Sequence, residues 1–114
     1  MPSVDQLYDE AIKLQEAGKL DEAIGRLEEL ARQEPNFALA PAALSVFYGK
    51  QGRHDEAVEQ ARLVCQLEPD DPFSFMAMSL VCQRAGRLAD AEQAMAQAME
   101  KQWEARYKGE SSEP

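Results

Sequence analysis

The chain has 114 residues, 45% of them apolar and 29% charged, a composition that suits one folded domain and argues against disorder. Its formal net charge of −9 repels phosphate backbones and anionic lipid surfaces, so nucleic-acid and membrane binding are disfavoured. The longest apolar stretch, residues 37–49, is too short to span a bilayer, and the N-terminus lacks the features of a signal peptide. We therefore expect a cytoplasmic protein whose two cysteines are free thiols.

Six helices in three pairs are predicted along the chain. Gly18, Gly52 and Gly86 recur every 34 residues, and each stands between two helix-compatible runs. Glycine at such a place is typical of a helix end in the left-handed conformation. The pattern predicts three helical hairpins, with helices over residues 4–17, 20–33, 38–51, 54–67, 72–85 and 88–107.

Capping chemistry supports several of these boundaries. Ser3 and Gln6 form a capping-box pattern, and Asp71 followed by Pro72 is an N-cap with proline at the first helical position. Pro41 is compatible with the third helix if it lies in the first turn, where its missing N–H has no intrahelical partner to lose.

Small residues recur at the expected crossing of each helix pair: Ala11 with Ala23, Ser45 with Ala57, and Ser79 with Ala91. Together with the 34-residue period, the glycines and the prolines at 35 and 69, they make the chain resemble the tetratricopeptide repeat family. The resemblance covers nearly the whole chain. It implies an all-α fold, a right-handed α-α superhelix of three hairpins over residues 4–37, 38–71 and 72–105, within a single domain of residues 1–108.

The two ends of the predicted stack differ from the repeats between them. Glu10 and Lys13 polarise a helix face that is apolar in the later repeats, as expected for a first repeat without a preceding neighbour. In the third repeat Trp103 replaces the terminal proline, so the last helix is expected to run through Tyr107 and stop at Gly109. Residues 109–114 would then be a flexible acidic tail.

The inventory of reactive residues does not favour an enzyme. The one histidine, His54, occupies the turn position of Leu20 and Leu88 in the other repeats, so packing explains it better than catalysis. No activated nucleophile, phosphate-binding loop or zinc-ligand spacing is present in the sequence. We expect no catalytic residues, no metal site and no cofactor.

The resemblance implies that the first helices of the repeats line a concave groove that receives a peptide or a helix. The predicted groove residues are mostly apolar: Tyr8, Ile12, Leu39, Ala43, Val46, Phe73, Met76, Ala77 and Leu80. Family members that grip a terminal carboxylate use Lys, Asn and Arg at stations that here are Tyr8, Ile12, Ala43, Phe73 and Ala77, so that ligand class is disfavoured. The net charges of the three repeats, −5, −3 and −1, favour a partner protein with apolar anchors and basic flanks near the first repeat. These features predict a non-enzymatic scaffold or adaptor that binds an apolar peptide or an amphipathic helix.

An alternative function is self-association. Four apolar residues recur every four residues on the last helix: Met95, Met99, Trp103 and Tyr107. An uncovered stripe of this kind is usually an interface, which makes a homodimer through this helix or through the grooves the rival hypothesis.

Overall fold

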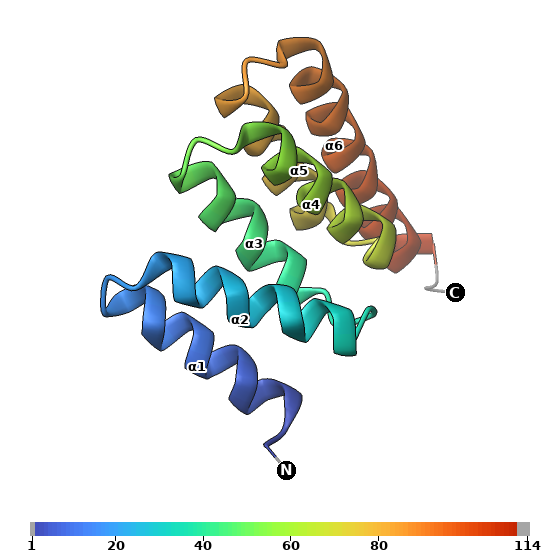
Figure 1. Cartoon of the computed structure of the whole chain (residues 1–114). Coiled ribbons are helices and arrows are strands. Elements are labelled where there is room, and N and C mark those ends of the chain that lie inside the picture. The colour runs from blue at the N-terminus through green and yellow to red at the C-terminus, as the bar shows by residue number, and fades with distance from the viewer. Residues whose placement is uncertain (1, 112–114) are drawn as a thin grey trace.

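The computed structural model describes the backbone of residues 2–111 and the side chains of residues 2–107. It contains six α-helices in chain order: α1 (Val4–Glu16), α2 (Leu20–Gln33), α3 (Leu39–Lys50), α4 (His54–Leu67), α5 (Pro72–Arg84) and α6 (Leu88–Ser111). They form three antiparallel hairpins stacked in order, α1 with α2, α3 with α4, and α5 with α6 (Figure 1). The predicted all-α superhelix is therefore confirmed.

The turns of the hairpins have the predicted chemistry. Gly18, Gly52 and Gly86 have φ angles of +82°, +77° and +77°, which side-chain-bearing residues adopt only with strain. At the start of α1, the Ser3 hydroxyl accepts a hydrogen bond from the Gln6 amide at 3.2 Å while the Gln6 side chain accepts one from the Ser3 amide at 2.8 Å. These local interactions set where the helices begin and end, and the first five lie within one residue of their predicted limits.

The end of α6 corrects one prediction. The helix continues past Gly109 to Ser111, so residues 109–111 are helical, and the rest of the predicted tail lies outside the described residues. Gly18, Gly52 and Gly86 end their helices because the chain turns there to pack the next helix. Gly109 precedes no packed element in the described part of the chain, and a glycine costs a helix only about 1 kcal/mol relative to alanine.

The small residues let the two helices of each hairpin approach closely. Ala11 and Ala23 are fully buried, and Ser45 and Ala57 are at most 5% exposed. In the third hairpin the Ser79 hydroxyl donates a hydrogen bond to the Ala91 carbonyl oxygen at 2.8 Å, which satisfies a buried polar group. The core runs through all three hairpins as one continuous cluster.

Polar contacts fasten each hairpin to the one before it. The side-chain amide Nε2 of Gln51 donates a hydrogen bond to the Asp21 carboxylate, and one repeat later the Arg87 guanidinium pairs with Asp55. The shape follows from this serial stacking. The radius of gyration is 15.7 Å, larger than the roughly 13 Å of a compact globule of this length.

The first joint, between the first and second hairpins, has an additional contact. The Tyr48 hydroxyl donates a hydrogen bond of 2.7 Å to the Glu28 carboxylate, and the Arg53 guanidinium carbon lies 4.3 Å from the centre of the Tyr48 ring. Burial and this hydrogen bond raise the pKa of Tyr48 to about 12. One repeat later the same position is Cys82, which is too short to make either contact.

Candidate functional site

The first helices of the second and third repeats, α3 and α5, expose large apolar side chains. Leu39 and Val46 on α3 are 48% and 43% exposed, and Phe73 and Leu80 on α5 are 69% and 47% exposed. Leu39 and Phe73 are the same position of successive repeats, and so are Val46 and Leu80. The two helices therefore present a paired row of apolar residues that the hairpins themselves do not use for packing.

A hollow of about 460 Å³ lies between the N-terminal ends of α3 and α5. Leu39, Ala42, Phe73 and Ala77 line it from the two helices. Ser74 of α5 and Asp71, the N-cap of α5, also line it. The rest of its wall comes from the turn before α3 and from the end of α4: Asn36, Phe37, Ala38, Val64 and Glu68. The apolar floor can take a side chain of a partner, and the two carboxylates at the rim favour a positive charge beside it.

The two carboxylates of the hollow, Asp71 and Glu68, differ in whether they bond to the chain itself. Asp71 is the N-cap of α5, and its side chain accepts a hydrogen bond from the Phe73 amide at 3.0 Å. Glu68 is exposed and makes no ion pair with any residue in the described part of the chain. Glu68 is therefore the more available of the two for a basic group of a ligand.

The predicted groove residues divide into two groups. Leu39, Val46, Phe73, Ala77 and Leu80 are exposed, as a contact surface requires. Ala43 is only 8% exposed and belongs to the core between the hairpins, so in this structure it supports the groove and does not line it.

The remaining predicted residues are half-buried. Met76 is of intermediate exposure, and Tyr8 and Ile12 of the first repeat pack against the core. The Tyr8 ring meets the Phe37 ring edge to face, with 5.9 Å between centroids. The exposed apolar surface therefore lies on the second and third repeats.

Sequence reasoning missed the residues that complete the hollow. Phe37 and Asp71 are the last residues of successive repeats, Val64 is on α4, and Glu68 is the C-cap of α4. A search restricted to first helices passes over them. The repeat period could have indicated the residues at the repeat ends, because the last residue of each repeat directly precedes the first helix of the next, and the N-terminal ends of α3 and α5 border the hollow.

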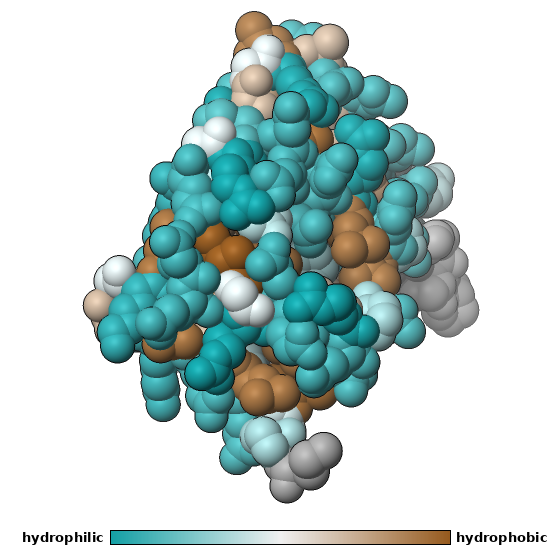
Figure 2. All heavy atoms as spheres, in the orientation of Figure 1, coloured by the Kyte–Doolittle hydropathy of each residue, from teal (hydrophilic) through white to brown (hydrophobic). Residues whose placement is uncertain are grey.

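The opposite side of the molecule differs from the groove. Figure 2, in which α4 lies in front of α5, shows a mostly hydrophilic surface with separate apolar patches. A hollow of about 330 Å³ among α4, α5 and α6 carries Arg62, Asp90 and three glutamines on its wall beside Phe75 and Met78. It is too polar to resemble the apolar hollow of the groove.

The described residues offer little for catalysis. They contain no group of three or more His, Cys, Asp or Glu side chains that could hold a metal ion. Burial raises the pKa of the Cys65 thiol to about 11, which makes it a poor nucleophile near neutral pH, and its Sγ lies 3.4 Å from the Ser74 carbonyl oxygen. None of the described helices has the length and apolarity that crossing a bilayer requires.

A second exposed apolar surface lies on α6. Met95, Met99, Trp103 and Tyr107 are 38%, 62%, 63% and 59% exposed, and the last two rings stack with centroids 6.0 Å apart. The structure thus places all four residues of the predicted self-association stripe on one exposed row.

The comparison with protein families gives a direct result. A family profile described as tetratricopeptide repeat matches residues 14–79, which is more than half of the chain. The chain belongs to the tetratricopeptide repeat family. No curated protein matches the sequence.

Solved structures of tetratricopeptide repeat proteins share the fold. A crystal structure of MamA has a TM-score of 0.82 at 20% identity, over 92% of this chain and 61% of that one. YrrB, described as a TPR protein with an unusual peptide-binding site, has a TM-score of 0.77 at 19% identity, over 90% of this chain and 53% of that one. The second TPR of Spaghetti (RPAP3), bound to the HSP90 peptide SRMEEVD, has a TM-score of 0.74 at 20% identity, over 84% of this chain and 89% of that one. The chain spans about three fifths of the length of the MamA structures it matches.

Proposed function

We propose that this chain is a non-enzymatic protein-interaction module that binds an apolar peptide or an amphipathic helix along the concave side of α3 and α5. The observation that carries the proposal is the paired row of Leu39, Val46, Phe73 and Leu80, each more than two fifths exposed. Burying large apolar side chains on a partner is favourable by about 1.5–3 kcal/mol each. The isolated chain leaves these side chains in contact with water, so binding a partner would gain this free energy.

The negative charge of the chain favours a partner that carries basic residues. The chain carries a net charge of −9, and Glu68 and Asp71 stand at the rim of the hollow beside Phe73. A ligand with an apolar anchor and a neighbouring Lys or Arg would satisfy both features. A peptide that ends in acidic residues would face these carboxylates, and the groove row offers no Lys or Arg to hold them.

The comparisons support a peptide-binding role without specifying the ligand. Among the proteins with the same fold, the RPAP3 domain binds an HSP90 peptide and YrrB is described as having a peptide-binding site. We infer that this chain acts as a scaffold or adaptor in the same general way. We place it in the cytoplasm, a reducing compartment in which the free thiols of Cys65 and Cys82 are stable.

The experiment is a selection of peptides from a random displayed library, followed by affinity measurement on synthetic copies by calorimetry. We expect selected peptides to share one or two large apolar residues next to Lys or Arg. Phe73→Glu and Leu39→Glu should each weaken binding at least about tenfold, because each replaces a buried anchor contact by a charge.

The matched control is Leu88→Glu, which places the same charge on an equally exposed apolar residue, 65% exposed, at the start of α6 outside the groove. Circular dichroism of all three variants should show unchanged helicity. Binding that survives both groove substitutions, or that falls equally with Leu88→Glu, would contradict the proposed site.

A further inference from the structure

The stripe on α6 is exposed although its helix is well packed. Ala91, Ala94 and Ala98 make the contact with the rest of the chain and are at most 3% exposed. Met99, Trp103 and the other stripe residues occupy an adjacent row, so removing them from water requires another surface. That surface is not supplied by any helix in the described part of the chain.

The repeat period shows what would normally cover part of this row. Met95 stands 34 residues after Ala61 and 68 after Leu27, which are 2% and 0% exposed because the next hairpin covers them. Glu92 takes the corresponding place of Ile24 and Val58, which are also buried. A further hairpin stacked in the same way would bury the Glu92 carboxylate, so α6 is poorly suited to it. The apolar row instead extends towards the end of α6, through Trp103 and Tyr107.

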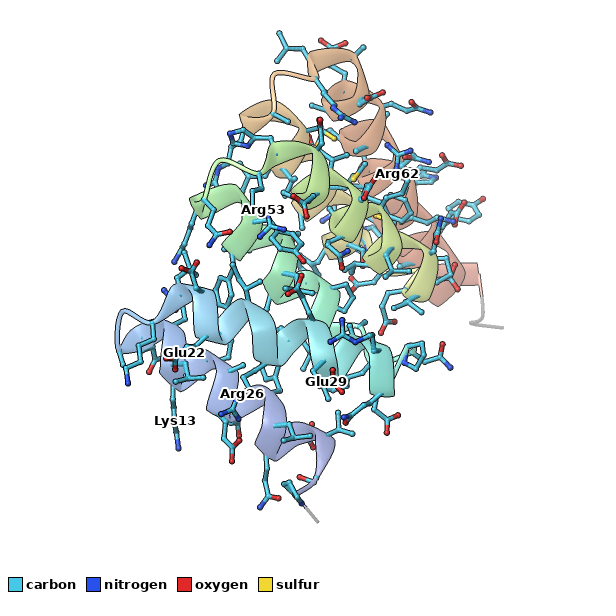
Figure 3. The ribbon with its side chains drawn as sticks, in the orientation of Figure 1. Lys13, Glu22, Arg26, Glu29, Arg53 and Arg62 are labelled. Carbon is cyan, nitrogen blue, oxygen red and sulfur yellow. The ribbon has the colours of Figure 1, made fainter. Side chains whose placement is uncertain are left out.

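The opposite end of the stack cannot receive this row either. Glu10 and Arg26 form an ion pair of 3.9 Å on the outer side of the first hairpin, and Lys13 lies beside them (Figure 3). Covering these charges with an apolar stripe would remove them from water without new partners. The two ends are therefore not complementary, which disfavours head-to-tail joining of copies into a filament.

A second copy of the same end is the complementary surface. The third repeat has a net charge of only −1, against −5 for the first, so two third repeats meet with the least repulsion that this acidic chain allows. We propose that the stripe of Met95, Met99, Trp103 and Tyr107 forms a symmetric dimer interface in which two α6 helices pack antiparallel. This inference is independent of the groove and goes beyond the proposed function.

The spacing of the stripe fits a two-fold axis between Met99 and Trp103. Antiparallel packing about that point sets Met99 against the partner's Trp103 and Met95 against the partner's Tyr107. Every contact then joins a thioether to an aromatic ring, a pairing that is favourable in proteins. The four residues span about 18 Å of helix. They would bury roughly 500 Å² on each copy, or about 1,000 Å² in all, which is the lower limit for a specific interface and predicts a dimer that dissociates at micromolar concentration.

Sedimentation equilibrium between about 1 and 100 µM tests the proposal. The wild-type chain, of 12.7 kDa, should move reversibly from monomer to dimer over this range. Trp103→Glu should weaken the dimer at least about tenfold. Gln97→Glu puts the same charge on an exposed residue of the same helix that faces the hollow beside α4, so it should leave the dissociation constant within about twofold. Phe73→Glu should also leave it unchanged, which separates this interface from mutual occupation of the grooves.

Fluorescence supplies a second reading, because Trp103 is the one tryptophan in the chain. Its emission should shift to shorter wavelength as the dimer forms, with the same concentration dependence as the mass. A monomer at 100 µM would overturn the proposal. So would a dimer that Phe73→Glu dissociates and Trp103→Glu does not, or a mass that keeps growing beyond the dimer.

Discussion

The first and third repeats have the same hairpin and the same internal spacing, yet their surfaces are opposite in kind. At one groove position the first repeat has Asp5 and the third has Phe73. At the ends of the stack, the first repeat exposes the Glu10–Arg26 ion pair and the third exposes Met99 and its neighbours. The residues at the crossing of the two helices stay small and buried in both repeats, Ala11 with Ala23 and Ser79 with Ala91. A repeat fold therefore leaves its exposed positions free to vary, and in this chain the large exposed apolar residues of the two surfaces described above lie in the second and third repeats.

The largest effect is expected from equivalent residues of these two repeats that differ in burial. Leu27→Ala should lower the free energy of unfolding by about 2–5 kcal/mol, because Leu27 is fully buried under the second hairpin. Met95→Ala, at the same repeat position and 38% exposed, should cost less than about 1 kcal/mol. Urea denaturation at about 1 µM, where a dimer would be dissociated, measures both. Equal losses would mean that the end of the third repeat is already covered within one chain.

A smaller effect should distinguish the first joint from the second. Tyr48→Phe removes the hydrogen bond to Glu28 and should lower the free energy of unfolding by about 1–2 kcal/mol at pH 7. At the second joint the equivalent residue is Cys82, which makes no comparable hydrogen bond. Cys82→Ala is therefore the control for a substitution at this position that removes no hydrogen bond between hairpins. Urea denaturation again gives both values.

The same tyrosine predicts a dependence on pH. Its pKa in the folded chain, about 12, is above the ordinary value of 10, so folding favours the protonated hydroxyl. Its contribution to stability should be complete below about pH 10 and should be lost as the pH rises towards 12. The free energies of unfolding of the wild type and of Tyr48→Phe, compared at pH 9 and pH 11, isolate the contribution of Tyr48. A difference between the two proteins that stays constant over this range would exclude the predicted link.

The smallest effect is expected from salt, and it should have opposite signs on the two apolar surfaces. Raising NaCl from 50 to 500 mM should weaken a basic-flanked peptide in the groove by several-fold, because the attraction to Glu68 and its neighbours is screened. It should strengthen the α6 dimer by about threefold, because the repulsion between two chains of net charge −9 is screened. Calorimetry for the peptide and sedimentation for the dimer measure the two slopes. Slopes of the same sign would remove the electrostatic distinction between the surfaces.

Local features of the fold were predictable from the sequence because each depends on a few neighbouring residues. The left-handed turn at Gly52 and the cap formed by Ser3 and Gln6 are examples, and both are present in the structure. The stop predicted at Gly109 was wrong, because a glycine costs a helix only about 1 kcal/mol, and the turns at Gly18, Gly52 and Gly86 are held in addition by the packing of the helix that follows. Such packing is a tertiary event that the local sequence does not contain.

The candidate surfaces show the same limit. Ala43 and Ala77 have the same repeat position and the same side chain, but the third hairpin covers Ala43 and leaves Ala77 exposed. Since α3 and α5 are apolar on nearly every side, periodicity cannot tell their core face from their groove face. The hollow beside Phe73 also needs Val64 and Glu68 from another helix, and only the folded chain brings them together.

The sequence alone determined the repeat architecture, since the 34-residue period, the turn glycines and the small crossing residues restrict each hairpin to one arrangement. It also determined the acidic first repeat and the apolar stripe on the last helix, which follow from residue type and helical spacing. The tertiary structure decided which apolar side chains remain in contact with water. The exposure of a side chain depends on how closely the next hairpin packs over it. This packing is set by all the helices together and cannot be derived from any one segment of the sequence.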